Sequence, residues 1–407
     1  MALDPPHAEE SEWASEELRE LAESAGVQVV GEFHQRRSRP DPAYLIGHGK
    51  AEELYEEVQE LGATVVIFGE DLNPTQQRNV ENTVLVRVID RTQLILDIFA
   101  QRAHTKEGKL QVELAQLAYL LPKLTGRGVE MTRLGGGVGT RGPGETKLEV
   151  DRRRIRARIT DLEDDLKEVV QRRSVQKQAR SKLPFPSAAL VGYTSAGKST
   201  LLNTLSGSDV LVDRRLFATL DPTTRRVVLP DGWSVLMSDT VGFIRNLPHH
   251  LVAAFKATLE EVIDADFLIH VVDSSHPKML KQMEAVLTVL RELGADDKPI
   301  VTVFNKSDLM SDQYELRRLV AETPDSAYIS AMNREGIRHL MDRVTATIRS
   351  LLIRVTLEIP YDRSDLVSVC YESGRVISAD YQNDRIVVLA DVARDIAARL
   401  ENYRRDI

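Results

Sequence analysis

One run of eight residues restricts the possible folds of this chain more than any other feature. It reads Gly192-Tyr193-Thr194-Ser195-Ala196-Gly197-Lys198-Ser199, between an apolar stretch at residues 188–191 and a helical pattern that opens at Thr200. In this setting the glycines let backbone N–H groups surround a phosphate, Lys198 neutralises phosphate oxygens and Ser199 can bind Mg²⁺. The run predicts an α/β fold with a mostly parallel, doubly wound sheet and a nucleotide site at its edge. By itself, it would also suit an ATPase.

A second motif for the phosphate side follows the apolar stretch at residues 234–237. It reads Asp239-Thr240-Val241-Gly242. Asp239 can reach Mg²⁺ through a water molecule, and the Gly242 N–H group can contact a γ-phosphate. The motif is short, so its weight comes from its place at the end of a predicted strand after the phosphate loop.

The choice of base depends on the motif Asn305-Lys306-Ser307-Asp308, which ends the apolar stretch 300–304. The Asp308 carboxylate can accept hydrogen bonds from the N1–H and N2 amino groups of guanine, whereas adenine presents an acceptor and no amino group there. After a strand predicted at 327–329, the backbone N–H groups of Ser330, Ala331 and Met332 would close over guanine O6. The motifs, in this order, predict a guanine-nucleotide site and a GTP hydrolase.

A polar segment between the first two motifs is predicted to be switch I, the segment that senses the γ-phosphate. Its predicted nucleotide contacts are Phe217, Ala218, Thr219, Leu220 and Asp221. One threonine should bind Mg²⁺ and the γ-phosphate when GTP is present. Thr219, Thr223 and Thr224 all qualify by chemistry, and spacing does not choose among them.

The residue after Gly242 is Phe243, where Ras-like enzymes keep a glutamine that orients the attacking water. A phenyl ring cannot hydrogen-bond to water in that way. We therefore expect slow GTP hydrolysis by the isolated protein and a partner that completes the site.

The 407 residues are enough for about three domains. Strand patterns at 27–30, 65–68 and 84–88 alternate with an amphipathic stretch at 51–61, and residues 71–74 look like a turn that starts a helix. Strand patterns return at 355–359, 375–378 and 386–389, with helices near 364–371 and at the chain end. We expect an N-terminal extension at 1–26, an α/β subdomain at 27–107, a helical hairpin at 108–182, a G domain at 184–350 and an α+β domain at 351–407.

The predicted hairpin carries two apolar stripes at helical spacing, one from Leu110 to Leu121 and one from Leu148 to Val169. A glycine-rich break at residues 125–144 separates them. The break carries Arg127, Arg133 and Arg141, which would suit insertion among RNA phosphates, although a plain connection between helices is the alternative. A formal GxGxxG match at 137–142 does not indicate a dinucleotide site, because no strand precedes it and a proline follows.

Charge is distributed unevenly along the chain, whose formal net charge is −9 at pH 7. Between residues 101 and 182, Lys and Arg outnumber Asp and Glu by about eight, so an RNA partner would bind there. Five arginines of this stretch, at 152, 153, 154, 156 and 158, would equally suit a solvated helix face.

The single cysteine, Cys370, cannot form an intramolecular disulfide and is expected in a core. No apolar stretch approaches the roughly 20 residues that span a bilayer, and the first ten residues do not resemble a signal peptide. A cytoplasmic location is expected.

These motifs, together with segments outside the G domain, resemble the HflX family of ribosome-associated GTPases. The further segments are residues 44–50, 71–77, 88–92 and 135–149. The resemblance implies a nucleotide-binding-like N-terminal subdomain, a helical hairpin, a G domain and a small C-terminal domain. It also assigns the Mg²⁺ role to Thr219, beside Ser199, and implies a hydrophobic residue at the position of Phe243.

The resemblance further implies binding to the large ribosomal subunit and its rRNA, and splitting or rescue of stalled ribosomes under stress. A GTPase that assembles the large subunit, and an RNA-binding regulator with incidental turnover, are the alternatives. We expect a monomer. ATP use has been ascribed to the family's N-terminal domain, but no second phosphate loop is recognisable there in this sequence.

Overall fold

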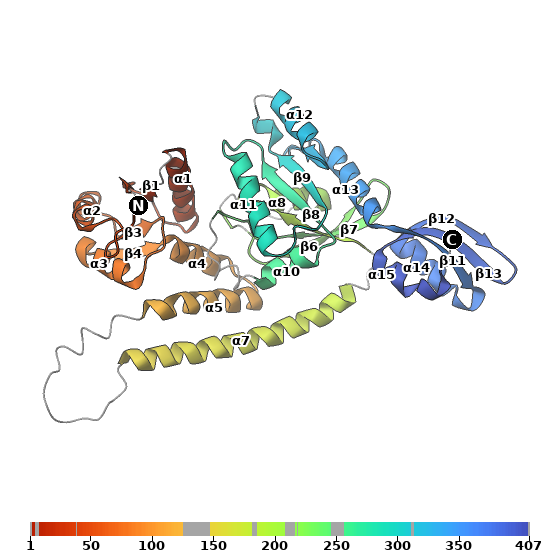
Figure 1. The fold of residues 1–407 in the computed structure, drawn as a ribbon, viewed down its shortest axis with the longest axis horizontal. Helices are drawn as coiled ribbons and strands as arrows, with labels where there is room; N and C mark the ends of the chain where they lie inside the picture. Colours follow the sequence, from red (N-terminus) through yellow and green to blue (C-terminus); the bar gives the residue numbers. More distant parts are fainter. Residues whose placement is uncertain are drawn as a thin grey trace. The chain divides into compact units, whose positions relative to one another are not determined.

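The computed structural model describes residues 2–4, 8–37, 39–124, 147–180, 185–207, 216–217, 219–245, 256–310 and 313–405 (Figure 1). By their contacts the residues form two units, which we describe separately. The first comprises Met1–Val170, Arg214–Asp221 and Leu247–Lys256, and the second contains the rest. Four predicted site residues lie outside the described parts, namely Arg127, Arg133, Arg141 and Ala218.

The first unit holds a small α/β subdomain. Its elements are β1 (Ala2–Asp4), α1 (Ala8–Ser24), β2 (His34–Arg36), α2 (His48–Leu61), β3 (Val65–Phe68), α3 (Pro74–Val84), β4 (Arg87–Asp90) and α4 (Arg91–Arg102). Strand β3 pairs with β4 and β1 with β2, both in parallel. The predicted helix start is confirmed, since Asn73 caps α3 in a capping box with Gln76 and Pro74 occupies the first turn.

One strand prediction for this subdomain is wrong, and another is correct only at residues 87 and 88. Residues 27–30 form no strand, and the nearby strand is β2 at His34–Arg36. The strand predicted at 84–88 is displaced because α3 extends to Val84 and ends with Leu85 in the left-handed region, at φ 57°. Strand β4 therefore begins only at Arg87.

The two predicted long helices are α5 (Lys106–Lys123) and α7 (Lys147–Arg180). The two helices lie side by side (Figure 1). The Arg158 guanidinium of α7 donates to both carboxylate oxygens of Glu113 of α5, at 2.8 and 3.0 Å. Leu110 of α5 and Leu162 of α7 are buried. The far end of α5 is fixed by a buried polar cluster in which Lys123 Nζ lies 2.7 Å from Asp90 Oδ2 and Tyr119 donates to the same oxygen.

The second unit is built on a six-stranded sheet of order β10-β9-β8-β5-β7-β6. Its strands are β5 (Ser187–Val191), β6 (Thr223–Val228), β7 (Ser234–Asp239), β8 (Phe267–Asp273), β9 (Ile300–Asn305) and β10 (Ser326–Tyr328), and only β6 runs antiparallel to its neighbour. Helices α8 (Lys198–Ser206), α10 (Lys256–Asp264), α11 (Met279–Glu292), α12 (Gln313–Glu322) and α13 (Ile337–Leu351) accompany the sheet (Figure 1). Strand β8 is an apolar run buried on both faces, as expected when helices cover both sides. The α/β prediction is confirmed.

After α13 comes an antiparallel sheet of order β11-β13-β12, formed by Ile353–Pro360, Arg385–Val392 and Gly374–Tyr381. Helices α14 (Asp365–Ser373) and α15 (Arg394–Arg399) complete this α+β part, close to the positions expected from the sequence. Cys370 is fully buried in its core, and burial raises the pKa of the thiol. Within the described residues, every helix is too short or too polar to cross a membrane.

Candidate nucleotide-binding site

The phosphate loop connects the end of β5 to the start of α8, as predicted. Gly197 precedes the helix with φ 94°, and a Cβ atom there would collide with Asn305 Nδ2. A Cβ atom on Gly242 would lie 2.8 Å from Thr194 Cγ2. Both positions therefore need glycine, because the phosphate-side motifs and the base-reading motif approach one another with no room for a side chain.

Lys198 is buried at this loop, where its Nζ donates to the carbonyl oxygens of Gly192 and Tyr193 at 3.0 and 2.9 Å. Burial lowers the pKa of Lys198 to about 8, and the Asp239 carboxylate opposes that shift. A phosphate beside Nζ would add negative charge and favour the ammonium form. The geometry suits a lysine that neutralises phosphate oxygens.

Ser199 and Asp239, the residues predicted to serve Mg²⁺, are hydrogen-bonded to each other. Ser199 Oγ donates to Asp239 Oδ2 at 2.6 Å. Hydroxyl and carboxylate oxygens are the hard ligands that Mg²⁺ takes, and Mg²⁺ at nucleotide sites uses few protein ligands besides phosphate and water. The pair therefore fits a Mg²⁺ ion, although no cluster of three or more His, Cys, Asp or Glu side chains within the described ranges could hold a metal alone.

Asn305 connects the phosphate loop to the base-reading segments. Its Nδ2 donates to Ala196 O at 2.9 Å, and its Oδ1 accepts from Ala331 N at 3.0 Å. Asp308 is exposed at the short turn after β9, as a carboxylate that binds a base from solution should be. Ser330 and Ala331 are buried, whereas Met332 is 70% exposed. The structure thus brings the three motifs to one edge of the sheet.

The structure describes the switch I prediction only in part. Phe217 and Asp221 belong to the first unit, where their side chains pack and hydrogen-bond as described below. Thr224 Oγ1 lies 2.8 Å from Ser238 Oγ within the sheet, and Thr223 is in register with Asp239. Thr224 is therefore already engaged, while the assignment of Mg²⁺ to Thr219 stays a prediction.

Phe243 is 1% exposed, and its backbone is tied to the phosphate loop. Its N–H group donates to Gly192 O at 3.1 Å, and its carbonyl accepts from Thr194 N at 2.8 Å. The ring is packed in the protein interior and offers no polar atom. Position 243 therefore cannot supply a group that orients water.

Sequence reasoning missed two residues near the site. His270 is buried on β8, where burial and the nearby Lys198 charge lower its pKa to about 4. Asp273 ends β8, and its Oδ2 lies 2.5 Å from Lys306 Nζ. Asp273 had a recognisable signal, because it stands at the carboxyl end of a buried strand, as the other motif residues do.

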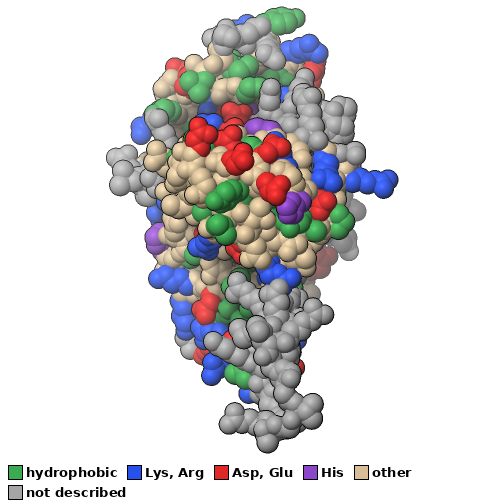
Figure 2. Space-filling model, turned by 90° about the vertical axis from the view of Figure 1, so that its left-hand side faces the viewer, with side chains coloured by type: hydrophobic (Ala, Val, Ile, Leu, Met, Phe, Trp, Pro, Cys, Tyr) green, Lys and Arg blue, Asp and Glu red, His purple; other side chains and the backbone are tan. Residues whose placement is uncertain are grey.

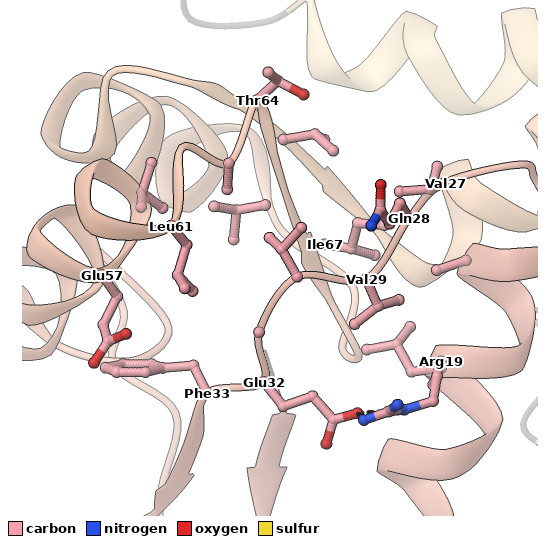
Figure 3. Close-up of a pocket in the computed structure, with 18 of the residues that line it drawn as sticks. Arg19, Val27, Gln28, Val29, Glu32, Phe33, Glu57, Leu61, Thr64 and Ile67 are labelled. Atoms are coloured by element: carbon pink, nitrogen blue, oxygen red, sulfur yellow. Dashed lines mark hydrogen bonds and ion pairs between the residues drawn. The ribbon is translucent and has the colours of Figure 1, made fainter.

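A cavity of about 520 Å³ lies in the first unit, and its lining contains none of these motif residues (Figure 3). Apolar side chains line most of it, including Val29, Leu61 and Ile67. Two of its charged groups are paired with each other, since Arg19 Nε donates to Glu32 Oε1 at 2.7 Å. The lining contains no phosphate loop and nothing that indicates a nucleotide.

The fold and these motifs define a P-loop GTPase. The matching family descriptions are "GTP-binding GTPase N-terminal" at residues 12–100, "GTP-binding GTPase Middle Region" at 102–180, "50S ribosome-binding GTPase" at 187–306 and "HflX C-terminal domain" at 315–403. The GTPase HflX of Caldanaerobacter subterraneus is 48% identical over 97% of this chain and 91% of its own length. That of Escherichia coli is 45% identical over 88% and 84%, respectively.

The chain therefore belongs to the HflX family, and it is a GTP hydrolase. Among solved structures, a GTP-binding protein of Sulfolobus solfataricus in complex with GDP is 26% identical, with a TM-score of 0.44, over 86% of this chain and 98% of that one.

Proposed function

We propose that this GTPase binds the large ribosomal subunit and couples GTP binding and hydrolysis to ribosome splitting or rescue under stress. The family match to a "50S ribosome-binding GTPase" supports the partner. We expect the protein to act in the cytoplasm as a monomer. The burial of Phe243 carries the proposal. It leaves the hydrolytic site without a water-orienting side chain at that position, so a partner has to complete the site.

We infer the roles of the site residues from this geometry and, for Thr219, from the family resemblance. Ser199, Thr219 and, through water, Asp239 would hold Mg²⁺, which supplies positive charge to the β- and γ-phosphates. Lys198 would neutralise the same oxygens, and the Gly242 N–H group would donate a hydrogen bond to the γ-phosphate. Asp308 would select guanine. Asn305 would hold the phosphate loop and the segment at Ala331 together through its two hydrogen bonds.

The charge pattern of α7 supports an RNA partner at one end of that helix. Its loop-proximal part contains Arg152, Arg153, Arg154, Arg156 and Arg158, and the next part contains Asp161, Glu163, Asp164, Asp165 and Glu168. On the face of the molecule drawn in Figure 2, which does not single out α7, acidic side chains gather in one area and Lys and Arg side chains lie mostly elsewhere. Phosphates would be attracted to the arginine end, beside the glycine-rich loop, and repelled by the acidic stretch.

Turnover measurements with purified large subunits test this function. If the ribosome completes the site, turnover should rise by tens-fold or more, since groups supplied by partners contribute about 10³ to 10⁵ elsewhere. Lys198→Ala should abolish the stimulated rate. A turnover rate that large subunits leave unchanged at every salt concentration would contradict the proposal.

A further inference from the structure

The predicted switch I segment is held by its side chains within the first unit. The carboxylate of Asp221 accepts hydrogen bonds from His104 N at 3.0 Å, Thr105 N at 2.9 Å and Thr105 Oγ1 at 2.5 Å. Thr105 is the N-cap of α5, and its Oγ1 also accepts from Gly108 N at 3.0 Å. Asp221 therefore places a negative charge at the positive end of α5, where a carboxylate is favoured.

Gly108 makes room for this interaction. It lies in the first turn of α5, where glycine is a poor helix former. A Cβ atom at position 108 would lie 2.6 Å from Asp221 Oδ1. The absence of a side chain at Gly108 is therefore what lets the carboxylate reach the helix start.

Residues before Thr219 are anchored in the same unit. Phe217 is 2% exposed and packs edge-on against Phe99 of α4, with the ring centroids 4.6 Å apart. Leu216 is buried, and its N–H group donates to Ser24 Oγ at 3.0 Å. Thr219 thus lies between two anchors, Phe217 and Asp221, that both belong to the first unit.

We propose that Asp221 is a positioning residue that docks switch I on the start of α5 and competes with binding of GTP. This inference rests on the proposed role of Thr219 in holding Mg²⁺. Thr219 is two residues from Asp221, and two residues span at most about 7 Å, so the docked carboxylate restricts the positions that Thr219 can reach. GTP then draws the segment off α5, whereas GDP, which lacks the γ-phosphate, leaves it docked.

The same docked carboxylate links the nucleotide state to the helical hairpin. Helix α5 begins beside Asp221 and ends at Lys123, immediately before the glycine-rich loop. Release of Asp221 removes an anionic partner from two backbone amides and loosens the first turn of α5. In the GTP-bound form, the start of α5 is therefore less restrained, and with it one end of the helical hairpin.

Two variants test the docking without touching the phosphate loop or the base-reading motifs. Asp221→Ala removes the carboxylate. Gly108→Ala places a methyl group against Asp221 Oδ1, so the carboxylate can no longer reach the start of α5. Affinities for fluorescent GDP and for a fluorescent non-hydrolysable GTP analogue are measured with Mg²⁺. We expect each variant to raise affinity for the GTP analogue about tenfold relative to GDP, because the competing docked state is destabilised.

The matched control is Asp41→Ala. The Asp41 carboxylate also accepts from two backbone amides, Ala43 N at 2.8 Å and Tyr44 N at 3.0 Å, in the same unit. Its removal should leave the ratio of the two affinities unchanged. An unchanged or lowered preference for the GTP analogue in both Asp221→Ala and Gly108→Ala would overturn the inference.

Hydrogen exchange gives a second readout, on the parent protein. The amides of His104 and Thr105 should exchange at least about tenfold faster with the GTP analogue than with GDP, and equal rates would overturn the inference. Thr219→Ala separates the premise from the inference, since it should weaken binding of the GTP analogue alone. Neither measurement contains ribosomes, so their outcomes are independent of whether the protein splits ribosomes.

Discussion

The ammonium group of Lys306 lies 2.5 Å from the carboxylate of Asp273, at the adjoining ends of β9 and β8. The other Asp273 oxygen accepts from Ser275 N at 3.0 Å and Ser275 Oγ at 2.6 Å, so the carboxylate is held from two sides. Lys306 itself has a left-handed backbone, with φ 62°. Asp273 therefore fixes the direction of the lysine in the base-reading motif.

Asp273→Asn should weaken GDP binding by about three- to tenfold, since a partly buried charge pair loses one partner. Lys306→Met keeps the unbranched stem and removes the ammonium. If Asp273 acts through Lys306, the double variant should bind GDP as tightly as whichever single variant has the lower affinity for GDP. Additive effects across this double-mutant cycle would show that the two residues act separately.

Asp308→Asn tests the reading of the base. The substitution removes the charge and replaces one of the two carboxylate oxygens by an amino group, so one guanine donor loses its acceptor. Each such bond contributes roughly 1.5 to 3 kcal/mol, so GTP affinity should fall at least about tenfold. Affinity for xanthine nucleotide should increase, because its C2 oxygen can accept from the new amide. Titration of both nucleotides checks this, and parent-like GTP binding would refute the assignment.

His270 predicts a pH dependence of stability. Its pKa is lowered from the ordinary histidine value of 6.5 to about 4, so between these values the unfolded chain binds a proton that the folded protein excludes. The stabilisation is complete above pH 6.5 and is lost as pH falls toward 4, by up to about 3 kcal/mol.

Denaturant unfolding at about pH 4.5 and about pH 7 measures this effect. His270→Asn should flatten the difference between the two pH values. The exposed His339, changed to Asn, serves as the control and should leave the difference intact. An unaltered pH dependence in His270→Asn would contradict the attribution.

Local sequence predicted which residues the fold brings together around the phosphate loop, and it did not predict the interactions of switch I. Phosphate-loop and base-reading residues follow buried strands, and parallel strands bring their ends together, so chain order sufficed for residues such as Lys198 and Asp239. Asp221 is 116 residues from Thr105, and nothing local indicates that they meet. The one available signal was Gly108, a glycine in the first turn of a predicted helix.

The error at residues 27–30 has a related physical cause. A run such as Val27-Gln28-Val29-Val30 has high strand propensity, but a strand also needs a neighbour whose backbone groups are in register. That neighbour is supplied by distant parts of the chain. In the structure the strand that pairs with β1 is β2, which begins at His34 and leaves residues 27–30 outside the sheet.

Three arginines of the glycine-rich loop provide a test of the RNA interface. Replacing Arg127, Arg133 and Arg141 by glutamine should flatten the salt dependence of ribosome binding. The log–log slope should decrease by about 0.7 to 0.9 for each phosphate that the protein no longer neutralises. GDP affinity, measured in parallel, should not change. A parent-like slope would indicate that the loop is only a connection between helices.

If GTP binding makes this protein act on assembled ribosomes, as we propose, joined ribosomes should come apart in its presence. Sucrose-gradient sedimentation of joined ribosomes with the protein and GTP, or its non-hydrolysable analogue, tests it most directly. We expect the joined-ribosome peak to fall and the free-subunit peaks to rise with the parent protein, and no change with Lys198→Ala. A joined-ribosome peak that stays constant, with the protein bound only to large-subunit precursors or bound equally without nucleotide, would contradict it.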